Sequence, residues 1–129
     1  ETLNRLNGKK YIILGNHCSS MKGIESRTNV EFVGHYYELK HAFKDSKKAH
    51  VVIFHYPILS WDRVHYGSWH IHGHVHGRLH NTEYSRRKVF DVGLDSIAHY
   101  LGNGSLLREN YRPLSIDEIR IIMDSKEKS

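Results

Sequence analysis

The sequence predicts an α/β domain, and three features of the chain lead to this prediction. Two short apolar runs, residues 11–14 and 49–54, have the composition of buried strands, and polar residues follow each of them. Residues 69–77 alternate apolar side chains with histidines at the period of a strand. A helix signal begins at residue 113. Because ligands of open α/β sheets collect beyond the carboxyl ends of strands, the polar residues at those ends are the candidate functional groups.

Length, charge and cysteine content narrow the class of protein. A chain of 129 residues suits one domain, 1–129, and it contains no apolar run of about 18 residues that would predict a membrane span. Its one cysteine, Cys18, is typical of a reducing compartment, so we predict a cytoplasmic location. The net charge of +5 favours anionic partners such as phosphates. Since the basic residues are scattered, a nucleic-acid-binding fragment is a weaker interpretation, and we expect nucleic acid only as a substrate.

The first predicted strand carries the first polar group. Residues 1–7 have the character of a helix end, stopped by Gly8. Residues 11–14 follow as a buried strand, and Asn16 and His17 stand just beyond it. A helix end that leads into a buried strand is typical of the middle of a larger fold, so we expect structure upstream of residue 1.

The middle of the chain is expected to form a hairpin and a second buried strand. Residues 30–39 have the pattern of two short strands around Gly34. Residues 49–54 form an apolar run that ends at His55, and Pro57 stops further pairing. His55 therefore follows its strand in the same way that a polar residue follows the first strand.

The histidine segment, residues 69–77, is predicted to be one strand with four imidazoles on a single face: His70, His72, His74 and His76. Alternate residues on a strand lie about 7 Å apart, so His74 and His76 suit two adjacent metals, one histidine each, roughly 3.5–4 Å apart. His70 and His72 share this face by alternation, and we expect them to support the site or the structure.

The last third of the chain predicts one strand and one helix. Residues 87–92 form the strand, which ends near Asp95, and residues 96–112 show little pattern. Ser115 and Glu118 predict a capping box, and an apolar stripe follows it at Ile116, Ile119, Ile122 and Met123. The remaining histidines carry no motif and are expected on the surface or in loops: His35, His41, His50, His65, His80 and His99.

Taken together, the polar strand ends resemble a known family. Gly15-Asn16-His17, then His55, then Gly73-His74-Val75-His76 resembles the calcineurin-like metallophosphoesterase family. The later segment 90–95, followed by Pro113 and a short helix, is similar to the tail of its small bacterial and phage members. The resemblance implies a sandwich of two mixed β-sheets flanked by helices. This chain would be its C-terminal portion, without the N-terminal part.

The same resemblance implies roles for five residues. Asn16, His55 and His74 would hold the second of two divalent metals, and His76 would hold the first. His17 would bind the substrate phosphate together with Asn16 and protonate the leaving oxygen. The expected metals are two per site, chosen among Mn, Fe, Zn and Ni. Two cations clamp the phosphoryl oxygens of a phosphate mono- or diester, and a nearby imidazolium can act as general acid.

The sequence departs from the family pattern in two places. Cys18 stands where the family usually has Asp or Glu, and neither Asp-x-His nor Gly-Asp precedes Tyr11. We therefore expect an upstream segment or a second chain to supply those motifs, and we expect the isolated chain to be weak or inactive. Two alternatives stay open: a non-catalytic phosphoesterase-fold scaffold that binds proteins, and an inactive fragment that needs a partner segment.

Overall fold

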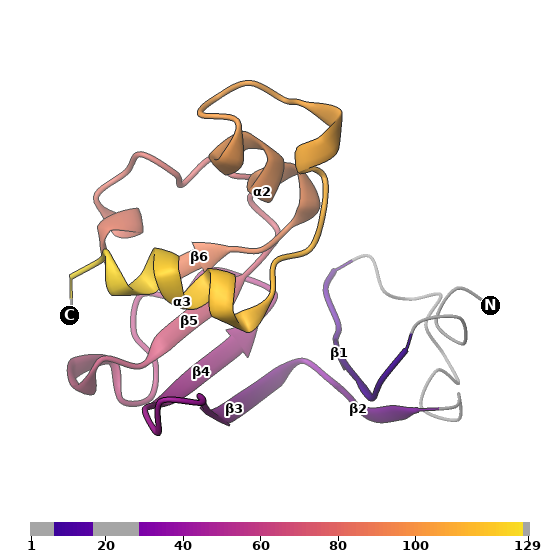
Figure 1. The fold of residues 1–129 in the computed structure, drawn as a ribbon, viewed down its shortest axis with the longest axis vertical. Helices are drawn as coiled ribbons and strands as arrows, with labels where there is room; N and C mark the ends of the chain where they lie inside the picture. The colour runs from indigo at the N-terminus through magenta and orange to yellow at the C-terminus, as the bar shows by residue number, and fades with distance from the viewer. Residues whose placement is uncertain (1–6, 17–28, 128–129) are drawn as a thin grey trace.

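The computed structural model describes residues 7–16 and 29–127. Within these ranges the chain is a mixed α/β structure with two sheets and two helices (Figure 1), so the α/β class predicted from the sequence is confirmed. Three short 3₁₀ helices complete the described elements: η3 (Val64–Tyr66), η4 (Tyr84–Arg86) and η5 (Arg108–Asn110). Most of the helix end expected at residues 1–7 lies outside the described residues.

The smaller sheet joins β1 (Lys10–Ile13) and β2 (Val30–Gly34), which run parallel. The strand predicted at 11–14 is therefore present, but it is only partly buried, because 49% of Tyr11 is exposed. The prediction of a hairpin at residues 30–39 is wrong, because β2 and β3 (Tyr36–Ala42) do not pair with each other. Only His35 separates β2 from β3, and hairpin loops usually need two residues or more, so the chain passes directly from one sheet into the other (Figure 1).

The larger sheet has the order β3-β4-β5-β6. β4 (Lys48–Phe54) runs antiparallel to β3, whereas β5 (Trp69–His72) and β6 (Val89–Asp91) run parallel to β4. The buried strand predicted at 49–54 and the strand predicted at 87–92 are both present. Because β4, β5 and β6 share one direction, the segments that follow them meet at one edge of the sheet.

The histidine segment does not continue as a strand to residue 77, which corrects the sequence prediction. β5 ends at His72, and the backbone then turns, with the N–H of Val75 donating to the carbonyl oxygen of Gly73 at 2.8 Å. His74 and His76 have positive φ angles of 72° and 53°. A left-handed backbone cannot extend a β-ladder, so the alternation of faces stops before His74.

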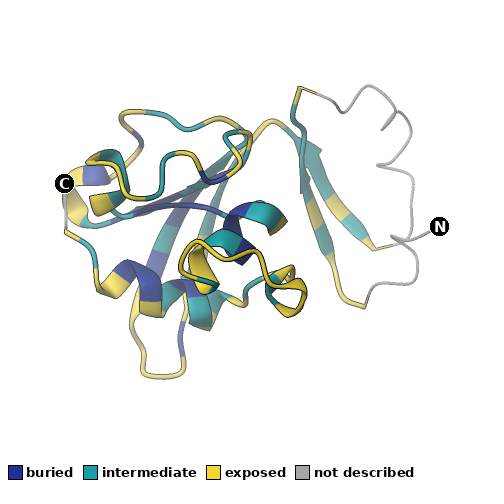
Figure 2. Ribbon diagram, turned by 90° about the horizontal axis from the view of Figure 1, so that it is seen from above, coloured by how far each residue is buried: buried dark blue, intermediate teal, exposed yellow. Residues whose placement is uncertain are grey.

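The core lies between one face of the larger sheet and the two helices, α2 (Leu94–Leu101) and α3 (Ile116–Asp124) (Figure 2). Val51, Trp69 and Phe90 from the strands are buried against Ile97 and Met123 from the helices. The apolar stripe predicted from residue 116 onward therefore faces the sheet.

The capping box predicted at the start of α3 is confirmed. The backbone N–H of Glu118 donates to Oγ of Ser115 at 3.1 Å, and the backbone N–H of Ser115 donates to Oε1 of Glu118 at 2.9 Å. Helix α2 was not predicted. It has only eight residues, Gly93 precedes it without a side-chain cap, and its stability comes from burying Ile97 and Ala98, which local sequence does not reveal.

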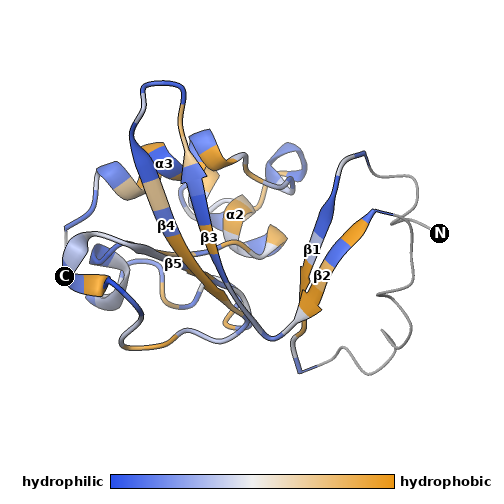
Figure 3. Cartoon of the chain, turned by 90° about the horizontal axis from the view of Figure 1, so that it is seen from below, coloured by the Kyte–Doolittle hydropathy of each residue, from blue (hydrophilic) through white to orange (hydrophobic). Residues whose placement is uncertain are grey.

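The opposite face of the larger sheet is also covered. Val52 and Val89 pack there against Trp61 and Val64, from the segment that links β4 to β5. In Figure 3, β1 and β4 are hydrophilic at their amino ends and apolar toward their carboxyl ends. The longer of the two α-helices, α3, has nine residues, so neither helix in the described ranges could cross a membrane.

Candidate functional site

A cavity of about 290 Å³ lies where the carboxyl ends of β4, β5 and β6 meet the end of β1. Seven residues line it: Asn16, His55, His74, His76, Asp91, Gly93 and Asp95. The structure thus brings together Asn16, His55, His74 and His76, the four metal-site residues named from the sequence. His17 and Cys18 lie outside the described residues.

Asn16 and His55 are in direct contact across the two sheets. Nε2 of His55 lies 3.0 Å from Oδ1 of Asn16, so the imidazole donates and the amide oxygen accepts. A Cβ atom on Gly15 would stand 2.7 Å from the His55 ring, which means that the glycine permits this approach. The carbonyl oxygen of His55 also accepts the backbone N–H of Gly73 at 2.8 Å, which fixes His55 to the segment after β5.

His74 stands next to His55. The two ring centroids are 5.1 Å apart and the rings are nearly perpendicular, while the ring of Tyr56 lies 4.6 Å from His74 on another side. The left-handed backbone at His74 aims this side chain into the cavity rather than along the strand face. Two imidazoles and one amide therefore converge at this end of the cavity.

His76 is oriented by Asp95. Nδ1 of His76 donates to Oδ2 of Asp95 at 2.5 Å, and the backbone N–H of Ser96 donates to Oδ1 of the same carboxylate at 2.9 Å. Burial raises the pKa of Asp95, but its contacts with His76 and Ser96 outweigh burial and lower the pKa below the usual value. With Nδ1 engaged, the Nε2 atom of His76 carries the lone pair of the neutral imidazole.

Asp91, at the end of β6, connects two walls of the cavity. Only 2% of this residue is exposed, and its two oxygens accept the backbone N–H groups of Gly77 at 2.9 Å and Gly93 at 3.1 Å. These bonds compensate the cost of burying the carboxylate. Neither Asp91 nor Asp95 was among the predicted site residues. Their position after a strand, the rule that identified the histidines, is the signal that could have found them.

The face formed by His70 and His72 is not a metal-facing surface, contrary to the alternation argument. His70 is fully buried: its Nδ1–H donates to the carbonyl oxygen of Val52 at 3.0 Å, and its Nε2 accepts the backbone N–H of Ile58 at 3.3 Å. Burial lowers the pKa of His70 to about 4 and also lowers the pKa of His72. Both imidazoles are therefore structural, which is one of the two roles expected for them.

Two of the histidines expected on the surface or in loops make specific contacts: His80 lies in a turn, as expected, whereas His50 does not lie in a loop. The ring of His80 stacks on Phe90 with centroids 5.5 Å apart and contacts the carbonyl oxygen of Ser96 at 3.0 Å. His50 lies on β4, and only 15% of its side chain is exposed. His50 was missed because a single histidine in an apolar strand gives no motif.

Among the described residues, one group of His, Cys, Asp or Glu brings three ligand atoms within 4.8 Å of one another, and it is Glu38, His50 and Asp62. The cavity histidines do not form such a group. The sharing of one ion by Asn16, His55 and His74 therefore stays a prediction.

The cavity combines imidazole nitrogens, an amide oxygen and two carboxylates. Such a donor set suits borderline transition metals such as Zn²⁺ and Ni²⁺ better than Mg²⁺. Evidence for its function comes from its own geometry, because a scan against protein-family models, a search of curated proteins and a search of solved structures each found no match for this chain.

Proposed function

We propose that this chain forms the histidine-rich part of a dinuclear metal centre of the calcineurin-like metallophosphoesterase type, which hydrolyses phosphate mono- or diesters. One observation supports the proposal most directly. Asn16, His55, His74 and His76 follow three different strands, and they line the same cavity. A single strand end with a histidine is common, but this combination in one cavity is what the proposed centre requires.

In this proposal the cavity holds two divalent ions, chosen among Mn, Fe, Zn and Ni. Asn16, His55 and His74 bind one of them, and His76 binds the other. The proton that Nε2 of His55 now donates to Asn16 has to move to Nδ1 of the same ring, or to solvent, before Nε2 can act as a ligand. When bound, the ions would polarise the phosphoryl oxygens of the substrate and activate a water molecule.

The residues of this chain contribute orientation. Asp95 holds Nδ1 of His76, and such outer carboxylates fix the ring and raise the basicity of the ligating nitrogen. Asp91 binds the backbone at Gly77 and Gly93 and so holds the two walls of the cavity together. His17 is proposed to contact the phosphate and to donate a proton to the leaving oxygen.

Two dications at short range repel each other unless carboxylates neutralise them. Both oxygens of Asp91 already accept backbone N–H groups, and Oδ2 of Asp95 holds His76. We therefore propose that a further segment bearing Asp-x-His and Gly-Asp, upstream or on a second chain, completes the centre. A cytoplasmic location and a phosphate-ester substrate belong to the same proposal, the former supported by the single cysteine.

A non-catalytic role is the second candidate. It is favoured by one observation: in the described part of the chain, no three of the imidazoles and carboxylates of this cavity bring ligand atoms within 4.8 Å of one another, as Glu38, His50 and Asp62 do. In that case the fold would serve as a protein-binding scaffold, and adding the missing motifs would produce neither a metal pair nor hydrolysis.

The experiment measures metal content by elemental analysis and hydrolysis of bis-p-nitrophenyl phosphate, using a His50→Gln variant so that the Glu38 group does not contribute. We expect this chain alone to bind at most one metal and to show negligible turnover. Fusing it to the N-terminal segment of a complete phosphoesterase, which carries both motifs, should give two metals and turnover. A fusion that folds, yet gains neither, would favour the scaffold role.

A further inference from the structure

A second group of potential ligands lies on the antiparallel pair β3–β4. In this register Lys40 pairs with His50 and Glu38 pairs with Val52, so these side chains and Tyr36 share one face of the sheet. Glu38 and His50 are diagonal neighbours on that face. This is the face that also carries His70 and is covered by the segment between β4 and β5.

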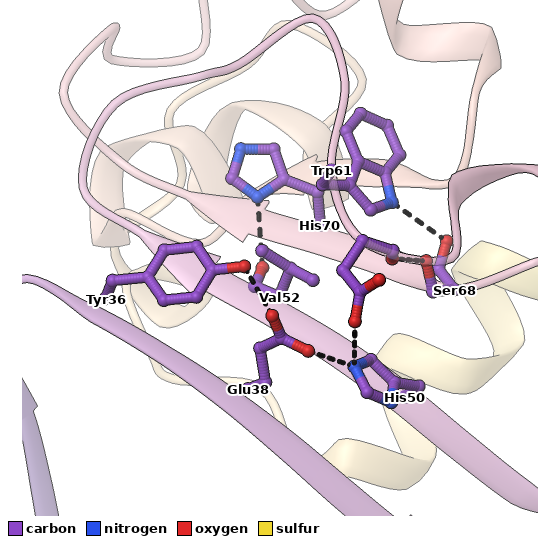
Figure 4. Close-up of polar contacts among 8 residues, drawn as sticks. Tyr36, Glu38, His50, Val52, Trp61, Ser68 and His70 are labelled. Carbon is purple, nitrogen blue, oxygen red and sulfur yellow. Dashed lines mark hydrogen bonds and ion pairs between the residues drawn. The ribbon is translucent and has the colours of Figure 1, made fainter.

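Two carboxylates, those of Glu38 and Asp62, contact Nε2 of His50, and Tyr36 contacts Glu38 (Figure 4). Oε1 of Glu38 lies 2.5 Å from this nitrogen, and Oδ2 of Asp62 lies 3.7 Å from it. The hydroxyl of Tyr36 donates to the other oxygen of Glu38, Oε2, at 2.6 Å. One carboxylate oxygen of Glu38 is thus held by Tyr36 while the other faces His50.

The loop that supplies Asp62 is held in place. The hydroxyl of Ser68 donates to the carbonyl oxygen of Asp62 at 2.6 Å, and the indole N–H of Trp61 donates to the carbonyl oxygen of Ser68 at 3.3 Å. Trp61 and Ser68 are both buried. Although 56% of the Asp62 side chain is exposed, its backbone is therefore fixed beside β4.

We propose that Glu38, His50 and Asp62 form a zinc site separate from the histidine cavity. One imidazole nitrogen and two carboxylate oxygens are common zinc ligands, and their atoms here lie within 4.8 Å of one another. Ligands bound at 2.0–2.1 Å in a tetrahedron stand about 3.3 Å apart. The contacts of 2.5 Å and 3.7 Å to His50 lie on either side of that value, so small side-chain movements admit the ion.

Charge and outer contacts fit the same ion. Two carboxylates balance the charge of Zn²⁺, and the ion replaces the proton that Nε2 of His50 donates to Glu38. The hydrogen bond from Tyr36 to Glu38 is of the kind that orients a ligating carboxylate from outside the coordination shell. Three protein ligands leave a fourth position for water or an anion.

A cavity adjoins the proposed zinc site at His50. It has a volume of about 350 Å³, and its other walls include the cationic side chains of Lys40, Lys48 and Arg63. This cavity shares no lining residue with the one around His55 and His74. An anionic group bound in it would meet both the cations and the zinc. The inference does not depend on the function proposed for the histidine cavity.

The alternative for the same three residues is a His50 imidazolium that bridges two carboxylates without metal. The test uses the full chain with His55→Ala and His74→Ala, so that the histidine cavity cannot contribute, and titrates it with Zn²⁺ alone. We expect one tightly bound zinc per chain by elemental analysis. Adding His50→Gln should abolish it, and adding Tyr36→Phe should weaken it about tenfold or more.

His35→Gln is the matched control, because His35 is an exposed histidine that joins β2 to β3, and it should leave the zinc in place. Circular dichroism of the zinc-free proteins checks folding. If His50→Gln does not fold, Asp62→Asn replaces it, since Asp62 is an exposed loop residue. Absence of bound zinc in the starting variant would overturn the proposal and leave the imidazolium bridge. Zinc that stays bound after His50→Gln, or after Asp62→Asn where that replaces it, would do the same.

Discussion

Nδ1 of His76 lies 2.5 Å from Oδ2 of Asp95, although the two residues belong to different walls of the cavity. His76 follows β5, whereas Asp95 lies in the first turn of α2. The contact joins the end of a strand to the start of a helix, and it selects which nitrogen of His76 faces the cavity.

The first prediction concerns this selection. In Asp95→Ala the carboxylate is gone, so the proton of neutral His76 redistributes between Nδ1 and Nε2. We expect ¹⁵N NMR of the imidazole to show mainly Nδ1–H in the parent protein and a mixture in the variant. Asp117→Ala, an exposed acidic change on α3, should leave the spectrum of His76 unchanged. An unaltered tautomer in Asp95→Ala would remove the orienting role assigned to Asp95.

The second prediction concerns Gly15. A Cβ atom there would come within 2.7 Å of the His55 ring, so Gly15→Ala must displace the imidazole and break its bond to Asn16. Overpacking of this kind should lower the free energy of unfolding by about 1–3 kcal/mol, measured by urea denaturation. Gly73→Ala is the control, because its Cβ would meet His55 at an ordinary 3.7 Å. Equal losses in the two variants would show that the approach of Gly15 to His55 is not what matters.

The third prediction concerns pH and His70. Its pKa is about 4 in the folded protein, because burial opposes the charged form, against an ordinary 6.5 in the unfolded chain. The unfolded chain therefore binds the extra proton between these values, and the contribution of His70 to stability, present above pH 6.5, is lost as the pH falls toward 4. The full effect is on the order of 3 kcal/mol.

Urea denaturation at pH 7 and pH 5 measures the part of this loss that falls between those two pH values. His70→Gln keeps an acceptor and a donor but cannot titrate, so it should reduce the loss of stability between the two pH values. The matched change at exposed His35, His35→Gln, should keep the full loss. A pH dependence that His70→Gln leaves as steep as before would contradict the assignment.

The fourth prediction concerns His17 in a form of the protein completed with Asp-x-His and Gly-Asp. Loss of a general acid typically lowers turnover about 10²–10⁴-fold. We expect His17→Ala to lower kcat in that range while the metal content by elemental analysis stays unchanged. His41→Ala, a change at a histidine without a motif, is the control. Loss of a metal from His17→Ala would instead make His17 a ligand.

Sequence reasoning succeeded in locating the polar residues that follow the strands and line one cavity. Asn16, His55, His74 and His76 could be identified because apolar runs predict strands and parallel strands place their following residues at one edge. The capping box of Ser115 and Glu118 could also be predicted, because it depends on only two residues that are three positions apart. These features are local, or they follow from one simple rule of sheet geometry.

The rest depended on tertiary contacts. Residues 30–39 alone do not indicate that β2 pairs with β1 while β3 pairs with β4. Strand pairing depends on contacts between residues far apart in the sequence. Helix α2 depends on burial of Ile97, which short-range propensity does not show. The contact of His50 with Glu38 needs the register of β3 and β4, so no spacing in the sequence could reveal it.

The passage of the chain through His35 has a mechanical consequence. The small sheet is joined covalently to the large one at this residue, and rings of Tyr11 and Phe32 rest on Tyr37 close to the junction. At the carboxyl end of β1, Asn16 and His55 provide a further connection between the two sheets. Any ligand that binds both Asn16 and His55 therefore holds the two sheets together. Its binding energy resists separation of the sheets, and it raises stability by RT ln(1 + [L]/Kd).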